Sequence, residues 1–246
     1  MHEIILWQVG NITLHAKTLV MTWVAMALIL IFAMLGVRNL TSGKPGKLQN
    51  VLEWVVDFVR KLVSDNMDYK KGAPLLSYLV TLIMFIFFSN MLGLIPNFVA
   101  PLFTHVEFAK LNEIFYGAAL MSPTADINTT LALATLTIIL VIALGIKHKG
   151  VHYFHHFIEP NPVFLPIHLI DILAKPMTLA FRLFGNIYAG EVLIAVILML
   201  PGLYVFGGIV PMPIWLGFSV FIGAIQSFVF TVLTIAYIAQ AVAQDH

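Results

Sequence analysis

Five long stretches of apolar residues, joined by shorter polar segments, dominate the pattern of this chain. Their apolar residues do not alternate with period two, which favours helices over β-strands as membrane-crossing elements. About 20 apolar residues in a helix cross the hydrocarbon core of a bilayer. The pattern predicts an all-α integral membrane protein, a single domain over 1–246, with about five spanning helices at 18–37, 75–96, 128–146, 162–200 and 213–242.

The last two stretches are longer than one perpendicular crossing needs, since a helix rises about 1.5 Å per residue. The fourth stretch is therefore expected to tilt strongly, to bend, or to begin outside the bilayer. Pro176 and Gly185 are places where it can bend. A short connection near Pro201 and Gly202 leads to the fifth stretch, and the two are predicted to form a long tilted hairpin.

The segment between the first two spans has a different pattern. Its apolar residues share one broad helical face, whereas its charged residues lie on the other face. The apolar set is Val51, Leu52, Val55, Val56, Phe58, Val59 and Leu62. This pattern predicts an amphipathic helix at the membrane interface. Residues 98–127 are compatible with a short re-entrant hairpin, and no internal repeat is visible.

Composition supports the membrane class. The 246 residues are 60% hydrophobic and 10% charged, and the mean hydropathy is +0.96; soluble domains are about 25% charged. A net charge of +1 gives no indication of nucleic-acid binding. The sequence contains no cysteine, which excludes disulfides and thiolate metal sites.

The distribution of lysine and arginine predicts the orientation. Most basic residues fall in the first and third loops, whereas Lys17 and Lys110 are expected on the opposite side. The loop residues are Arg38, Lys44, Lys47, Arg60, Lys61, Lys70, Lys71, Lys147 and Lys149. The positive-inside rule makes these loops cytoplasmic, with the N-terminus outside and the C-terminus inside. The first apolar stretch lacks a basic leader and a clear cleavage site, so a retained span is favoured over a signal peptide.

Arg182 is the residue in these stretches with the highest free-energy cost of insertion into a membrane. A guanidinium stays charged in proteins, and a charge near the bilayer centre costs about 2.5–3.5 kcal/mol on insertion scales. On a helix, Asp171 lies within about 20° of Arg182, and His168 and Asn186 lie within about 40°. Glu191 lies about 180° away, so an ion pair with Arg182 on one face is not expected. Small residues that allow another helix to approach share the arginine's face: Thr178, Gly185 and Ala189.

Polar residues from three further segments complete the candidate set. They are Ser219, Gln226 and Tyr237, within about 20° of each other on the fifth span, Asn90 on the second span, and Asp126 and Asn128 before the third. Gln226 has a donor and an acceptor that suit a guanidinium on a facing helix. Each of these residues also has a structural alternative. Interhelical hydrogen bonds are the alternative for Asn90, Asn128, Ser219 and Gln226, and a helix N-cap is the alternative for Asp126. Asp171 is able to form an i,i+4 pair with Lys175, and Tyr237 is able to act as an anchor at the membrane interface.

Four histidines cluster at 148–156, but a metal site is not favoured there. No carboxylate stands among the four, which are His148, His152, His155 and His156. A di-haem protein would need paired histidines on two spans, and the sequence contains no P-loop. We therefore expect no cofactor, no metal and no direct nucleotide binding.

The polar residues within the spans suit proton or cation translocation. A fixed cation favours the ionised form of a carboxylate that comes close to it. Arg182 is therefore able to force deprotonation of a carboxylate on a mobile partner, while Glu191, Asp171 and His168 carry protons along water-lined paths. A free-standing ion channel or secondary transporter is one alternative, and a structural scaffold is another.

Four segments resemble, in order, characteristic segments of subunit a of the F-type ATP synthases. They read FFSNMLGLIPN, SPTADINTTLALA, KPMTLAFRLFGNIYAGE and IQSFVFTVLTIAYIAQA. The resemblance covers most of the chain and implies a membrane stator subunit, not catalytic by itself, beside a ring of c proteolipid subunits and bound to peripheral-stalk b subunits. It implies proton coupling, with a sodium-coupled version as the alternative. A bacterial cytoplasmic membrane is expected rather than an organelle, because the sequence shows no transit-like leader.

The resemblance also implies residue roles. Arg182 matches the stator arginine that faces a c-ring carboxylate, and Asn186 and Gln226 match its polar neighbours. Glu191 matches a residue of one of two offset aqueous half-channels. Ser219 stands where some bacterial members carry a histidine thought to pair with that glutamate, and a water held by Ser219 is able to substitute for it. The other candidates for lining the half-channels are Asn90, Asp126, Asn128 and Tyr237.

Overall fold

The computed structural model describes residues 6–9, 12–38, 40–41, 43–94, 122–150, 165–199 and 211–243. Two short strands, β1 (Leu6–Val9) and β2 (Ile12–His15), pair antiparallel ahead of the helices. The longer helices are α1 (Ala16–Val37), α2 (Lys47–Asn66), α4 (Leu76–Leu92), α7 (Ile127–Lys149), α9 (Leu165–Met199) and α10 (Pro211–Val242). The short helical turns are α3 (Tyr69–Gly72), η1 (Ala73–Leu75) and η2 (Pro123–Ala125).

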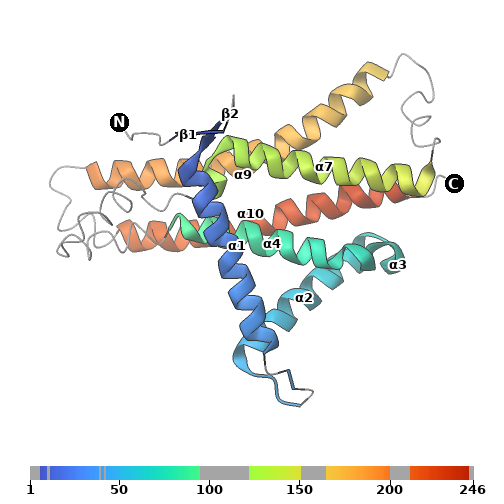
Figure 1. Cartoon of the computed structure of the whole chain (residues 1–246), viewed down its shortest axis with the longest axis horizontal. Coiled ribbons are helices and arrows are strands. Elements are labelled where there is room, and N and C mark those ends of the chain that lie inside the picture. Colours follow the sequence, from blue (N-terminus) through green and yellow to red (C-terminus); the bar gives the residue numbers. More distant parts are fainter. Residues whose placement is uncertain are drawn as a thin grey trace.

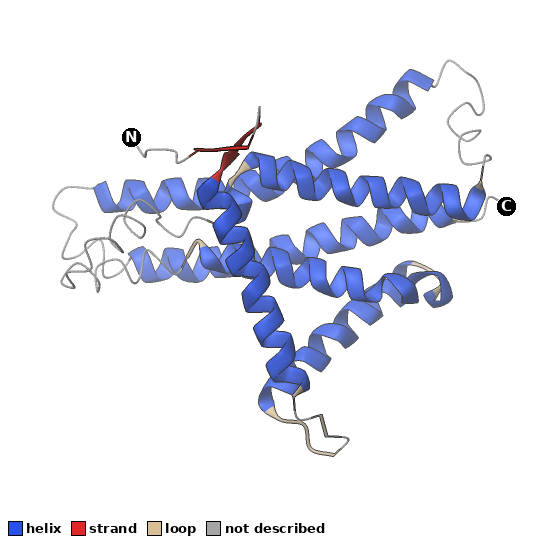
Figure 2. Cartoon of the chain, in the orientation of Figure 1, coloured by secondary structure: helices blue, strands red, loops and turns tan. Residues whose placement is uncertain are grey.

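The predicted all-α membrane class is confirmed, and Figure 2 shows a body made of helices with the two strands near the N-terminus. Four of the described helices are long and apolar enough to cross a membrane: Thr18–Val37, Tyr69–Leu92, Ile127–Lys149 and Pro213–Val242. α9 is the fifth long helix, at the predicted place. It is not among those four, and it carries Asp171, Lys175, Arg182 and Glu191. The β1–β2 pair is not foreseen by the apolar pattern.

Two helix ends differ from the prediction. α4 ends at Leu92 rather than near Pro96, because the chain turns at Gly93 and the Leu94 N–H donates to the Met91 carbonyl at 3.0 Å. α7 continues past Lys147 and ends before Gly150, whose φ of 60° favours glycine. Residues 95–121, which include most of the predicted re-entrant segment, lie outside the described part of the chain.

The two long C-terminal helices are present, with 35 residues in α9 and 32 in α10. In Figure 1 α9 changes direction along its length, and its N-terminal end diverges from the other helices. Pro176 lies inside α9, where the missing N–H and the bulky ring disturb the hydrogen-bond ladder. Pro176 therefore gives a physical cause for the bend that was predicted at this proline or at Gly185.

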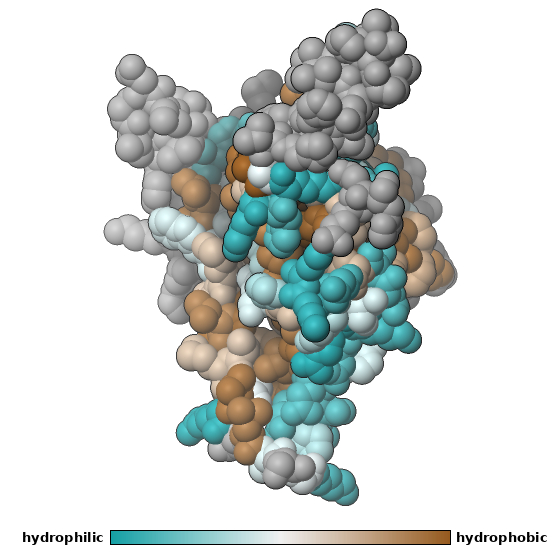
Figure 3. Space-filling model, turned by 90° about the vertical axis from the view of Figure 1, so that its right-hand side faces the viewer, coloured by the Kyte–Doolittle hydropathy of each residue, from teal (hydrophilic) through white to brown (hydrophobic). Residues whose placement is uncertain are grey.

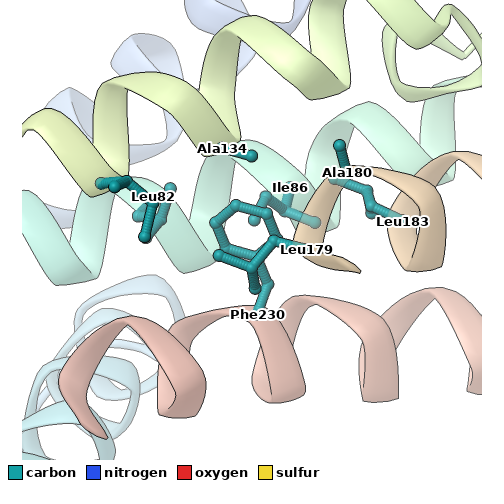
Figure 4. Close-up of a cluster of buried hydrophobic side chains, with 8 residues drawn as sticks. Leu82, Ile86, Ala134, Leu179, Ala180, Leu183 and Phe230 are labelled. Atoms are coloured by element: carbon teal, nitrogen blue, oxygen red, sulfur yellow. The ribbon is translucent and has the colours of Figure 1, made fainter. Parts of the chain in front are cut away.

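Four helices meet in one apolar core, shown in Figure 4. The cluster consists of Leu82 and Ile86 of α4, Ala134 and Ile138 of α7, Leu179, Ala180 and Leu183 of α9, and Phe230 of α10. Ala134 and Ala180 are fully buried, which lets neighbouring backbones approach closely. This core fixes one side of α9 against the bundle and leaves Arg182 outside the core.

Gly223 of α10 lies against α4. A Cβ added at Gly223 would lie 3.0 Å from Met91 Cε and 3.2 Å from Asn90 Cβ, and Asn90 Nδ2 donates to the Gly223 carbonyl at 3.0 Å. We expect Gly223→Val to destabilise the fold by about 1–3 kcal/mol, because the added methyl groups must separate the helices. Thermal unfolding in detergent measures this. Gly217→Val is the control, since a Cβ there meets no atom within 4 Å; equal melting points would contradict the close contact.

α2 confirms the predicted amphipathic helix. Val59 and Val63 are fully buried in a cluster with residues of α4, whereas Glu53, Asp57 and Arg60 are exposed. Figure 3 shows a strip of hydrophilic surface beside hydrophobic surface on the side of the molecule where α2 and α3 lie in Figure 1. Such a two-sided surface suits a helix that lies at a membrane interface.

Candidate functional site

Arg182 lies on α9 outside the apolar core. Its neighbours Leu179, Ala180 and Leu183 are at most 1% exposed, whereas Arg182 itself is exposed. Within the described ranges, no carboxylate forms an ion pair with its guanidinium. The permanent charge of Arg182 is therefore available to a group from outside the chain.

Small residues flank Arg182 on the same exposed surface. Thr178, Gly185 and Ala189 are all exposed, and a Cβ added at Gly185 would meet no atom within 4 Å. The Thr178 hydroxyl is turned to its own helix, where it donates to the Ala174 carbonyl at 2.9 Å. The predicted small-residue face is present and is open enough for another helix to lie against it.

Asn186 and Gln226 join α9 to α10 one turn from the arginine. Asn186 Nδ2 donates to Gln226 Oε1 at 2.8 Å, and Gln226 is 3% exposed. Among the residues that the structure describes, Gln226 makes no hydrogen bond to Arg182. Contact of Gln226 with the guanidinium therefore stays a prediction, and the observed partner of Gln226 Oε1 is Asn186.

Glu191 lines a cavity of about 220 Å³ between α4, α9 and α10. The polar side chains of its wall are Asn90, Asn186, Glu191, Trp215 and Ser219. Glu191 is half-buried, and its Oε1 accepts a hydrogen bond from the Ser122 N–H at 3.2 Å. In agreement with the helix geometry, no ion pair joins Glu191 to Arg182 in the described part of the chain. A carboxylate thus shares an apolar-walled space with neutral polar groups, and the space has room for water.

Ser219 lines the same cavity. Its Oγ is buried and has no hydrogen-bond partner among the described residues. A buried hydroxyl without a partner is costly unless water satisfies it. Trp215 also lines the cavity, and its Nε1 donates to the carbonyl of Gly190, another lining residue, at 3.3 Å. A water between Ser219 and Glu191 stays a prediction, and the cavity supplies the space for it.

Asn90 connects three segments of the structure. It is 2% exposed, donates from Nδ2 to the Gly223 carbonyl at 3.0 Å, and accepts at Oδ1 from the Thr124 hydroxyl at 2.7 Å. The interhelical role allowed for Asn90 is therefore observed, and Asn90 also lines the cavity. The sequence pattern does not predict that Asn90 bonds to Thr124 of η2. The only local signal is the Ser122–Pro123 step, which is typical of the start of a helix.

Asp126 caps α7 and ties it to α1. Its carboxylate accepts from the Asn128 N–H at 2.8 Å and the Thr18 hydroxyl at 2.9 Å, and its Oδ2 lies 3.0 Å from His15 Nδ1. Burial alone would raise the pKa of Asp126, but these hydrogen bonds outweigh it and lower the pKa below its usual value. The N-cap alternative is observed, and Asn128 donates a second bond from Nδ2 at 3.1 Å.

Asp171 and Lys175 form the ordinary i,i+4 pair that was the alternative for them. Lys175 Nζ lies 2.8 Å from Asp171 Oδ2 and 5.5 Å from the ring centroid of Tyr237. Tyr237 is half-buried and packs against the apolar core. His168 falls within α9, but its side chain lies outside the described part.

The histidine cluster is described only at its start. His148 Nδ1 lies 2.9 Å from the Leu144 carbonyl, whereas His152, His155 and His156 lie outside the described residues. Across the ranges that the structure covers, no group of three histidine, aspartate, glutamate or cysteine residues is placed to hold a metal ion.

Comparisons with known proteins show the family of this chain. The family model described as ATP synthase A chain matches residues 19–239. The ATP synthase subunit a of Desulforamulus reducens is 42% identical over 242 residues, which cover 97% of this chain and 84% of that protein. Subunit a of Lysinibacillus sphaericus is 41% identical over 251 residues, covering 100% and 99%. Subunit a of Bacillus subtilis (strain 168) is 40% identical over 248 residues, covering 96% of each. Matches of this length and identity show that this chain belongs to the ATP synthase A chain family of integral membrane proteins.

Proposed function

We propose that this chain is the proton-translocating stator subunit of an F-type ATP synthase, which turns ion flow into rotation of a c-ring. The observation that carries the proposal is the placement of Arg182: a permanent charge on an exposed face of small residues, with no ion-pair partner in the described part of the chain. A membrane protein keeps such a charge only where a partner or water compensates it. The partner in this proposal is the carboxylate of a passing c subunit.

We infer two offset half-channels, one on each side of Arg182. Protons reach the ring through the cavity beside Glu191, where Asn90 and Ser219 are able to hold water. They leave along the end of α9 that carries Asp171, near His168 and Tyr237. Arg182 separates the two paths because its charge repels a proton that would pass directly between them.

The contacts of Asp126 support the predicted orientation of the chain in the membrane. Asp126 bonds to His15 and Thr18 at the start of α1, so the start of α7 lies at the same end of the molecule as the start of α1. The basic residues of 38–71 follow the opposite end of α1. The positive-inside rule then places that end in the cytoplasm and Asp126 at the outer surface, beside the proposed inlet.

The proposed partners are the c proteolipid subunits, the b subunits of the peripheral stalk and the lipid of a bacterial cytoplasmic membrane. Each proton that moves down a membrane potential releases about 2.3 kcal/mol per 100 mV. Several protons must therefore be combined for each ATP, which a rotating ring achieves and a single-site transporter does not.

Reconstitution into liposomes tests the proposal. The chain alone is expected to give no proton flow, and flow is expected once it is combined with a c-ring, because the carboxylate that carries the proton past Arg182 belongs to the ring. A small proteolipid should also co-purify with the chain. Flow from the chain alone would favour a free-standing channel, and flow that depends on sodium would favour the sodium-coupled version.

A further inference from the structure

Glu191 is held by a donor from a segment far away in the sequence. The backbone N–H of Ser122, 69 positions earlier, donates to Glu191 Oε1 at 3.2 Å. Ser122 is 2% exposed and precedes η2 with φ of −56° and ψ of 128°. A backbone donor cannot rotate away as a side chain can, so the position of Ser122 decides where this contact forms.

Two buried hydroxyls hold Ser122 in place. The Ser122 hydroxyl donates to the Ser89 carbonyl at 2.8 Å and lies 2.6 Å from the Thr124 hydroxyl. The Thr124 hydroxyl donates to Asn90 Oδ1 at 2.7 Å. Ser122, Thr124 and Asn90, here called the clamp, are each at most 2% exposed.

The available protons leave the Ser122 hydroxyl with a hydrogen-bond partner in every arrangement. Asn90 Nδ2 faces the Gly223 carbonyl, so Oδ1 must face Thr124, and the single hydroxyl proton of Thr124 is committed to it. The proton of Ser122 then has two acceptors within reach, the Ser89 carbonyl and Thr124 Oγ1. The Ser122 hydroxyl is therefore bonded to α4 or to η2 in either arrangement.

Gly93 leaves the space that this contact needs. A Cβ added at Gly93 would lie 2.8 Å from Ser122 Cβ and 3.1 Å from Glu191 Oε1. Gly93 and Glu191 also line the same cavity as Ser219. The turn after α4, η2 and Glu191 therefore fit together at one wall of the cavity.

We propose that Ser122 is a positioning residue for Glu191, and that the clamp aims the Ser122 N–H so that the carboxylate stays at the cavity wall for proton exchange. The inference rests on the proposed function, in which Glu191 carries protons. Ser122 acts through Glu191 and does not itself carry a proton.

Two substitutions at Ser122 separate its N–H from its hydroxyl. Ser122→Pro removes both, and its φ of −56° already suits proline. Ser122→Ala removes only the hydroxyl and keeps the N–H. Passive proton flow through the membrane sector, in vesicles stripped of the catalytic sector, is expected to fall about tenfold in Ser122→Pro relative to Ser122→Ala. The pH of half-maximal flow should also move by about half a unit or more. Ser122→Ala also loses one hydroxyl of the clamp, so its flow should lie between that of the unmodified chain and that of Ser122→Pro. A rate and a pH profile of Ser122→Pro equal to those of the unmodified chain would overturn the proposal.

Thr124 gives a second test if Ser122→Pro fails to assemble with the c-ring. Thr124→Val removes the hydroxyl at nearly constant volume and leaves the buried Asn90 Oδ1 without a partner, so flow should fall several-fold with a shifted pH profile. Thr124→Ser keeps the hydroxyl and should restore both. A Thr124→Val variant that behaves like the unmodified chain would overturn the proposal. Glu191→Gln distinguishes failure of the proposed function from failure of the clamp. Normal proton flow in Glu191→Gln contradicts the proposed function. Slow flow in Glu191→Gln together with normal flow in Ser122→Pro contradicts only the role of the clamp.

Discussion

Arg182→Ala is expected to abolish ATP-driven proton pumping by the assembled complex, lowering the initial rate about 100-fold or more. In the proposed mechanism, without the guanidinium nothing forces the ring carboxylate to release its proton, and nothing blocks direct passage between the two half-channels. Because Arg182 is exposed and makes no ion pair within the described residues, its removal leaves no buried partner unpaired. Assembly with the c-ring should therefore persist. Dye quenching in inverted vesicles after addition of ATP measures the pumping rate.

Two further variants make the result specific to the guanidinium. Arg182→Lys should also fail, since an ammonium is able to lose its proton and lacks the planar fork of arginine. Phe181→Leu, at an exposed neighbour on α9, should pump normally and shows that the helix surface tolerates change. Normal coupling in Arg182→Ala would contradict the proposed mechanism.

Glu191→Gln is expected to slow passive proton flow by about tenfold or more. Glutamine has nearly the same size and still accepts the Ser122 N–H, so the fold and the cavity should be kept. It cannot take up or release a proton, however, and the proposed path through the cavity is interrupted. Flow in vesicles stripped of the catalytic sector, driven by a potassium diffusion potential, measures the effect.

Glu191→Asp is the matched control for this variant. It retains a carboxyl group but shortens the side chain by one methylene, so flow should be intermediate between that of the unmodified chain and that of Glu191→Gln. If Glu191→Gln conducts as fast as the unmodified chain, Glu191 is not in the path, and the cavity that it lines has a structural role.

The membrane class and the long helices could be predicted because a spanning helix requires a long apolar stretch. The ends of α4 and α7 could not be predicted from the apolar pattern, because they depend on the turn at Gly93 and on the positive φ of Gly150. Apolar runs also continue past the point where a helix stops. The β1–β2 pair has strands of 4 residues each, too short for a pattern to stand out.

The face of Arg182 could be predicted because the helical period alone places Thr178, Gly185 and Ala189 beside it. The same helical period predicts that Glu191 and Arg182 lie on opposite faces of α9. The contact of Ser122 with Glu191 could not be predicted, since 69 positions separate the two residues and no local pattern encodes which backbone N–H meets a carboxylate. For Asp126 and Asp171 the structural alternatives are the ones observed.

Disulfide cross-linking shows whether the Arg182 face meets the carboxylate of a partner subunit. The chain contains no cysteine of its own, so single cysteines can be placed at will. Gly185→Cys lies on the exposed face, whereas Ala180→Cys occupies a fully buried position on the same helix. With a second cysteine beside the carboxylate of the c subunit, we expect a cross-link from position 185 and none from position 180. No cross-link from position 185 in an active, assembled complex would contradict it.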